Sequence, residues 1–501
     1  MKRTTLYWIL FFATLILLSW AVQSARSQTY EGAEGYGAIA NGGRVEGTKE
    51  VHVTRMDDPK FERTPWTQWK HLVPGTLRWA MHQRGPKKII FDQPGTIRLW
   101  CPLQITTIYN GPISAHDRVN NMTFNETRQP ITIIGSININ GMAGADTVWL
   151  NTRFRAALWN NGWRPFQGGP QATGDPFILI GAGNCLVDHC EFSGGADETF
   201  NYISGVGKLT LQWSVVCEAF KQGDFGMKWG DDYNHNYGTI VTFGADREDT
   251  GVTIAHCLFA NLQKRIPYAL TSVPANPPAK HAEIVNTVCY NWGTHSGSTQ
   301  SRDYAVLVGN TWRYGPNAGY GTRTAAVGYM SPSYHRDNVV DYYGKLEALA
   351  TAPATIHGFR GFSSLGATPP EPLHEFPVTV TERVKSIEDV LNKAGVFPLD
   401  NVSAANRQAY RDGTGWQGAH PDYKAGTLDE YLTWATATAA DQLEPTPIPD
   451  PDPIPDPDPE PLPDPDGQTV TDDEFIEAIR DANDAARIIR LWQEQEGIEA
   501  P

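Results

Sequence analysis

Cysteine is the side chain whose number and spacing limit the possible chemistry most directly. The chain of 501 residues contains six of them: Cys101, Cys185, Cys190, Cys217, Cys257 and Cys289. No two of them have the CxxC spacing of common zinc sites, which argues against a zinc centre. Disulfides are permitted if the chain is exported, but six cysteines are too few to form the scaffold of a chain of this length.

The distribution of charge narrows the class of partner. The whole chain carries 41 basic and 56 acidic residues. Residues 445–466 contain seven acids and no base, and residues 467–501 contain nine acids and three bases, so residues 1–444 are close to neutral. A nucleic-acid partner would require a basic patch. The composition therefore favours a neutral or mildly acidic partner, such as a sugar.

The first 27 residues have the organisation of a secretory signal. Lys2 and Arg3 precede an apolar run from Leu6 to Val22, and small and polar residues follow as far as Ser27. A retained signal anchor is the alternative, because 17 residues almost span a bilayer at 1.5 Å per residue. The sequence predicts cleavage after Ser27 and a soluble protein that is secreted or periplasmic.

The C-terminal region separates into a spacer and a helix. Proline occupies every second position of residues 445–466, mostly with aspartate between, which predicts a disordered, extended linker of roughly 70 Å in the polyproline II conformation. Residues 467–501 begin a helix at the capping box Thr471–Glu474. This helix either docks on an unknown protein partner or has no role.

Residues 28–444 contain short β-rich runs punctuated by Gly, Asn and Asp. When several runs are aligned by their ends, one column holds small or polar residues: Cys190, Ser214, Cys257, Thr287 and Asn310. A residue of this kind that recurs once per few strands is typical of a stacked parallel β-helix, in which each coil turns at the same place. A β-sandwich would need closer strand spacing and hairpin turns. In the helical arrangement Cys190 and Cys257 lie two coils apart and should not form a disulfide.

Several motifs in this body resemble the pectate lyase family, family one of the polysaccharide lyases. The motifs are AEGYGA (33–38), VHVTRMDD (51–58), CLVDHCEFSGGADE (185–198), KLTLQWSVVCEAF (208–220), IAHCLFANLQKRIP (254–267) and EIVNTVCYNWG (283–293). They cover most of residues 29–320 in the family's order, and VLNKAG (390–395) is similar to a segment of a bacterial branch. The resemblance implies an all-β, single-stranded, right-handed parallel β-helix. It also implies a lyase that cleaves pectate, an acidic polysaccharide, by β-elimination.

The resemblance implies a calcium site at Asp175, Asp197 and Asn201. Carboxylate and amide oxygens suit this hard cation, which can also bridge to substrate carboxylates. Asn201 stands where the family often has an acid, so the affinity for calcium should be lower than with three acids. The alternative for the acids is a role in turns and caps.

The resemblance also implies roles for basic side chains. Arg265 matches the arginine that removes the proton at C5 of the substrate, and a surface salt bridge is the alternative role. Lys221 matches a substrate lysine in the catalytic set, and Lys228 is a nearby rival. With Lys228, the residues His235 and His256 are the candidates for substrate binding. Two family positions differ, because Leu270 and Ala255 stand where an arginine and a histidine are usual.

Three functions remain open from the sequence. The first is a secreted, calcium-dependent pectate lyase, and the second is a metal-free lyase that acts on methyl-esterified pectin. The third is a β-helix without catalytic activity that binds glycans. The joint presence of Asp175, Asp197, Lys221 and Arg265 favours catalysis, because a binding protein has no need of that set.

Overall fold

The structure is a computed structural model of the chain. It describes residues 30–60, 72–106, 114–156, 158–159, 172–173, 175–221, 224, 236–243, 250–271, 281–293, 295–299, 304–317, 325–330, 333–342, 345–348, 359–360, 376–416, 419–422 and 427–439. The predicted signal segment, the Pro-Asp linker, the C-terminal helix, Lys228 and His235 lie outside these residues. Within them, no helix combines the length and the apolar character needed to cross a membrane.

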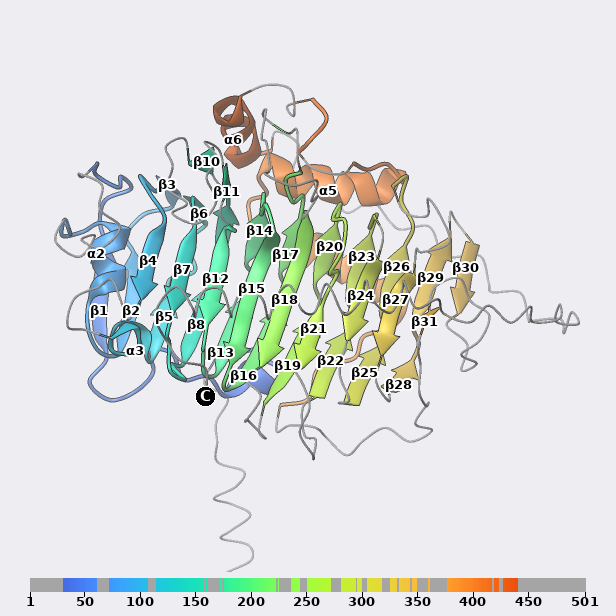
Figure 1. Cartoon of the computed structure of the whole chain (residues 1–501), viewed down its shortest axis with the longest axis horizontal. Helices are drawn as coiled ribbons and strands as arrows, with labels where there is room; N and C mark the ends of the chain where they lie inside the picture. Colours follow the sequence, from blue (N-terminus) through green and yellow to red (C-terminus); the bar gives the residue numbers. More distant parts are fainter. Residues whose placement is uncertain are drawn as a thin grey trace, which may run out of the picture. The chain divides into compact units, whose positions relative to one another are not determined.

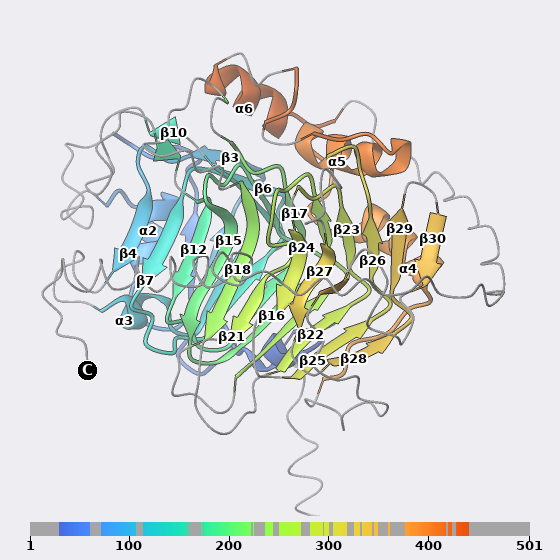
Figure 2. The same cartoon turned by 45° about the vertical axis from the view of Figure 1, so that its right-hand side comes forward.

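Three long stacks of strands form the body of the protein (Figures 1 and 2). The first sheet contains β1 (Lys49–Val53), β2 (Lys87–Phe91), β5 (Met122–Phe124), β8 (Thr147–Leu150), β13 (Cys185–Asp188), β16 (Lys208–Gln212), β19 (Gly251–Ala255), β22 (His281–Val285), β25 (Tyr304–Val308) and β28 (Ser333–Arg336). The second sheet contains β3 (Gly95–Arg98), β6 (Ile131–Ile134), β9 (Thr152–Arg155), β14 (Glu191–Ser193), β17 (Val215–Cys217), β20 (Leu258–Ala260), β23 (Val288–Tyr290), β26 (Thr311–Arg313), β29 (Val339–Tyr342) and β30 (Lys345–Ala348).

The third sheet carries the candidate site. It contains β4 (Leu103–Thr106), β7 (Ile137–Asn140), β12 (Phe177–Ile180), β15 (Glu198–Gly205), β18 (Tyr237–Phe243) and β21 (Ala269–Thr271). A separate three-stranded sheet contains β24 (His295–Thr299), β27 (Ala325–Met330) and β31 (Phe359–Arg360), and β10 (Leu158–Trp159) pairs with β11 (Ala172–Thr173). The shorter helical segments are η1 (Tyr36–Ile39), α2 (Leu77–His82) and α3 (Ala115–Val119).

The order of the strands along the chain defines the fold. The chain visits the third, first and second sheets in turn, as β12, β13 and β14 do, and the next visit adds β15, β16 and β17 beside them. Strand pairing within the described sheets is parallel except in β29–β30 and β10–β11. The protein is therefore a right-handed parallel β-helix, as the sequence predicts.

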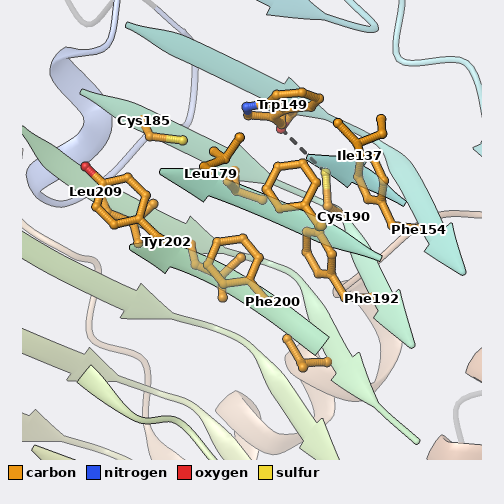
Figure 3. Packing of buried hydrophobic residues seen from close by; sticks show 14 of the residues in the cluster. Ile137, Trp149, Phe154, Leu179, Cys185, Cys190, Phe192, Phe200, Tyr202 and Leu209 are labelled. Atoms are coloured by element: carbon orange, nitrogen blue, oxygen red, sulfur yellow. Dashed lines mark hydrogen bonds between the residues drawn. The ribbon is translucent and has the colours of Figure 1, made fainter. Parts of the chain in front are cut away.

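Alternate side chains of each strand fill the interior of the coils. In β12, Phe177 and Leu179 are fully buried, and Phe200 and Tyr202 occupy the same layer in β15. Figure 3 shows such side chains stacked coil upon coil, and the rings of Phe177 and Phe200 lie 5.6 Å apart. Offset aromatic contacts of this kind add to the free energy gained by burying the ring surfaces. The core therefore holds successive coils in register.

The corner between the first and second sheets contains the polar column that the sequence predicts. Ser214 Oγ accepts a hydrogen bond from Cys190 N at 3.1 Å, and Asn310 Oδ1 accepts one from Thr287 N at 2.9 Å. Asn310 Nδ2 donates to the carbonyl oxygen of Ile284 at 2.8 Å. The side chains of the column thus provide hydrogen-bond partners for backbone N–H and C=O groups at the corner, where the strands end. All six cysteines are buried and free in this structure, Cys190 and Cys257 among them.

The last described segment runs back over the second sheet. It contains α4 (Arg383–Lys393), α5 (Asn401–Asp412) and α6 (Leu428–Thr436), which appear in orange in Figure 2. Each helix begins at a capping side chain, which accepts hydrogen bonds from backbone N–H groups of the first turn. Apolar side chains of these helices share one buried cluster with side chains of β17, β20 and β23.

Buried polar contacts fix these helices to the coils. Arg155 of β9 donates to Glu191 at 2.6 Å and to Asp400, the cap of α5, at 2.7 Å. Glu218, which follows β17, accepts hydrogen bonds from the Tyr431 hydroxyl at 3.0 Å and from the His420 backbone at 2.7 Å. Burial raises the pKa of Glu218 to about 8, although these hydrogen bonds oppose the rise.

Candidate active site

Asp175, Asp197 and Asn201 come together at the start of the third sheet. Asp175 lies just before β12, and Asp197 lies just before β15, which pairs with β12 in parallel. One carboxylate oxygen of Asp175 accepts a hydrogen bond from the backbone N–H of Asp197 at 3.1 Å, and the other accepts one from Asn201 Nδ2 at 3.1 Å. The parallel register of the coils therefore brings the three predicted metal residues into one cluster.

The orientation of Asn201 bears on its role as a ligand. Its side-chain nitrogen faces Asp175 Oδ2 and also the carbonyl oxygen of Phe177, at 3.4 Å. Both of these neighbours are acceptors, so the amide nitrogen and not the amide oxygen belongs on this side. With this orientation Asn201 supports Asp175 by hydrogen bonding and does not present its carbonyl oxygen beside the Asp175 carboxylate.

The donor set fits calcium through two carboxylates. Calcium takes about six to eight oxygen ligands, so Asp175 and Asp197 would need substrate and water oxygens to complete the shell. Across the part of the chain that the structure describes, no group of three or more His, Cys, Asp and Glu side chains is placed to hold a metal ion. The cluster is therefore suited to a cation that is shared with an acidic ligand.

Arg265 lies beside this cluster, on the next coils of the same sheet. Its guanidinium forms an ion pair with Glu198, the first residue of β15, and the two side chains are only 13% and 9% exposed. The guanidinium carbon lies 4.5 Å from the ring centroid of Tyr237 and 5.4 Å from that of Tyr268. A carboxylate and two aromatic rings therefore restrict the position of this arginine.

The backbone explains why these side chains meet. Glu198 pairs with Tyr237 in the register of β15 and β18, and Tyr237 forms a parallel bridge with Lys264. The N–H of Thr239 donates to the carbonyl oxygen of Arg265 at 2.9 Å. Because Asp197 and Glu198 are consecutive, the carboxylate cluster and the arginine adjoin.

The described contacts of Lys221 are those of its backbone. Its backbone N–H donates to the carboxylate of Asp224 at 2.9 Å, and that carboxylate also accepts from Ala419 N at 2.7 Å. Within the described residues, its hydrogen bonds connect Lys221 to Asp224 and not to Arg265 or Asp175. Within the described residues, none of these hydrogen bonds joins Lys221 to the other predicted site residues.

His256 lies at the corner between the first and second sheets. Its ring stacks on Trp213 with the centroids 4.3 Å apart, and Nε2 lies 3.4 Å from a carboxylate oxygen of Glu34. The side chain is only 2% exposed. These contacts are those of a residue that connects coils, and they place His256 on another corner than Asp175 and Arg265.

Three contacts of Arg265 were missed by the sequence analysis, namely Glu198, Tyr237 and Tyr268. Glu198 follows Asp197 directly, which was the only signal for it in the sequence. Its pairing with Arg265 depends on the register between coils, and the two residues are far apart in the chain. A register of this kind cannot be obtained from the spacing of motifs alone.

The outward face of the third sheet extends from the cluster to the coils on both sides of it. Its described positions form two rows in register: Gln104, Asn138, Ile178, Asn201 and Ile240 in one, and Thr106, Asn140, Ile180 and Ile203 in the other. All nine side chains are uncharged. Within the described structure, Asn138 Oδ1 is buried and has no hydrogen-bond partner, so this face retains an acceptor that a ligand hydroxyl could satisfy.

Comparison with protein-family models gives no match. Curated proteins named "Probable pectate lyase C" are similar over part of the chain. The protein of that name from Aspergillus flavus is 24% identical over 334 residues, which are 63% of this chain and 60% of the relative. The Emericella nidulans protein is 24% identical over 311 residues, which are 61% of this chain and 59% of the relative. These relatives are fungal, so the bacterial branch stays a prediction.

Solved structures give a weaker likeness. Jun a 1, the major allergen from cedar pollen, has a TM-score of 0.46 at 15% identity and covers 75% of this chain and 95% of its own. A thermostable pectate lyase has a TM-score of 0.44 at 15% identity and covers 74% of this chain and 96% of its own. Because these scores are low, the fold assignment relies on the strand topology. With respect to the curated relatives, the chain spans about three fifths of the length of the fungal pectate lyase C proteins to which it is similar.

Proposed function

We propose that the protein is a secreted polysaccharide lyase that cleaves polygalacturonate by β-elimination. The observation that supports the proposal is that Arg265 pairs with Glu198, which directly follows Asp197, whose backbone N–H donates to the Asp175 carboxylate. A glycan-binding protein without catalytic activity would not need a confined arginine beside a carboxylate cluster. The similarity to proteins named pectate lyase C supports the same reaction class.

In this reaction the proton at C5 of a galacturonate is removed and the C4 oxygen leaves. The C5 proton is weakly acidic, and it becomes more acidic when the adjacent carboxylate is neutralised. Calcium supplies that neutralisation when bound, and Asp175 and Asp197 would hold it. Arg265 would accept the C5 proton as a neutral guanidine that has first given a proton to solvent, and the departing C4 oxygen would take a proton from water. The neighbours Tyr237 and Tyr268 hold the side chain in place. Asn201 keeps Asp175 oriented through its hydrogen bond.

A second candidate function is the elimination of methyl-esterified pectin without a metal. The uncharged rows of the third sheet favour it, because a row of isoleucine and amide side chains offers no cation to successive carboxylates. An ester is already neutral, so its C5 proton needs no cation for activation. Because this substrate needs no cation, its elimination would not require ligands beyond those found around Asp175.

One experiment distinguishes these candidates. The protein is mixed with polygalacturonate and, separately, with highly methyl-esterified pectin, and the ultraviolet absorbance of the unsaturated uronide is followed with and without a chelator. The calcium-assisted lyase should act on polygalacturonate and stop when the chelator is added. Activity on pectin that resists the chelator would favour the second candidate. Binding of either polymer without new absorbance would indicate a glycan-binding protein.

A further inference from the structure

We infer that Glu198 is a positioning residue that sets the location of Arg265 for proton removal. The inference rests on the proposed lyase function, because it assigns Glu198 a role in that reaction. Glu198 begins β15, and Arg265 follows the bridge between Lys264 and Tyr237, so each residue is fixed by strand pairing. The ion pair joins two coils at the point where the reaction is proposed to occur.

The environment of the pair makes its geometry well defined. An exposed arginine samples many rotamers, and an exposed ion pair contributes little to order. Arg265 and Glu198 are instead 13% and 9% exposed, and two tyrosine rings flank the guanidinium. A guanidinium is planar and directs its N–H groups in a fixed fork, so a carboxylate that engages part of the fork determines where the remaining N–H groups point.

The charge of Glu198 also has a consequence for the substrate. The guanidinium is already paired with a carboxylate of the protein, so its charge is not fully available to a substrate carboxylate. Other groups must then bind that carboxylate, and the Arg265 nitrogen that Glu198 does not engage can remain directed at the C5–H bond, where it acts once it has given its own proton to solvent. Lys264 and Asp197 are the other charged residues next to this pair in the sequence, and Lys264 lies 5.6 Å from the ring of Tyr237. Glu198 is thus expected to affect turnover more than substrate affinity.

A double-mutant cycle tests the inference. Glu198→Gln keeps the size of the side chain but removes its charge, and Glu198→Asp keeps the charge but retracts the carboxylate. Each change should lower kcat by about 10- to 100-fold, the cost of a misplaced reacting group, with KM within about threefold. In the Arg265→Lys background the same changes should have almost no further effect, because Glu198 acts through Arg265.

Glu283→Gln is the matched control, since it removes a carboxylate from β22 of the first sheet, where Glu283 accepts a hydrogen bond from Thr253. It should keep native kcat and a native melting temperature. The Glu198 variants leave a mostly buried guanidinium without its full partner and should melt at a lower temperature, so kcat of every variant is measured well below its melting temperature. Losses that multiply in the double variant would overturn the inference and indicate that Glu198 acts independently of Arg265. Native kcat in both Glu198 variants would also exclude it. If the unaltered protein forms no unsaturated product from either polymer, the proposed function fails instead.

Discussion

Arg265 is the residue on which the proposed chemistry depends most. Arg265→Lys keeps a positive charge but shortens the side chain and removes the fork that engages Glu198. Turnover should fall by about two to four orders of magnitude, the usual contribution of a positioned acid–base group. The measurement is the initial rate of unsaturated uronide formation. Near-native turnover would remove Arg265 from proton transfer, and loss of folding would favour a structural ion pair.

Asn201 is the residue at which a substitution should change the affinity for calcium. Asn201→Asp replaces the amide that donates to Asp175 with a carboxylate, which adds an oxygen ligand but also places two like charges together. A cation then stabilises both acids, so calcium should bind more tightly than in the unaltered protein. Isothermal titration of both proteins with calcium measures the difference. Equal affinities would exclude Asn201 from the neighbourhood of the cation.

At the residue scale, the structure joins some of the predicted site residues by hydrogen bonds and places others elsewhere. Asp175, Asp197 and Asn201 meet because they lie at the starts of paired strands, which motif alignment preserves. Lys221 and His256 were assigned by the same alignment, yet their contacts lie with Asp224 and with Trp213. The direction of a side chain after a strand depends on the local backbone, and His256 has a positive φ of 55° that spacing cannot reveal.

At the scale of elements, the polar column between the first and second sheets is predicted to contribute to stability. Asn310→Ala removes hydrogen bonds to the backbone of Thr287 and Ile284, and both groups then remain buried. The loss should be about 2–4 kcal/mol of unfolding free energy. Cys257→Ala is a control in the same column, because its sulfur makes only weak contacts with carbonyl oxygens. Denaturant unfolding of both variants measures the difference, and equal losses would contradict the expectation.

The contact between Glu218 and helix α6 should make stability depend on pH. The carboxyl has a pKa of about 8 in the folded protein against an ordinary value of 4.5, so the unfolded chain loses its proton first as the pH rises. Its contribution to stability therefore declines between about pH 4.5 and pH 8. Glu218→Gln should flatten the fall in melting temperature over this range. A variant with the unaltered slope would show that Glu218 does not titrate in this way.

The column and the coil order were predictable because a recurring residue type marks each turn. Ser214 and Asn310 could be aligned without any knowledge of the fold. The return of α4, α5 and α6 over the second sheet was not predictable, because it depends on contacts such as Arg155 with Asp400. Such a contact joins distant parts of the chain, and no local pattern encodes it.

For the whole molecule, we expect the region from residue 445 onward to be dispensable for catalysis. All proposed site residues precede it, and a Pro-Asp repeat cannot join an apolar core. A protein that ends at residue 444 should keep its melting temperature and its turnover on soluble substrate. Circular dichroism and the absorbance assay measure the two. Aggregation or loss of most activity in the shortened protein would contradict this expectation.

The position of α4, α5 and α6 over the second sheet affects the order in which the protein can fold during synthesis. These helices contact both early and late coils. Asp429 of α6 pairs with Arg98 of β3, and the carbonyl oxygen of Tyr410 in α5 accepts a hydrogen bond from Arg313 of β26. A stack of coils can otherwise fold progressively, since each coil touches only its neighbours. A ribosome releases these helices after every coil that they contact. The second sheet therefore remains uncovered during synthesis until residues 376–439 have emerged, so the nascent chain must avoid aggregation over that period.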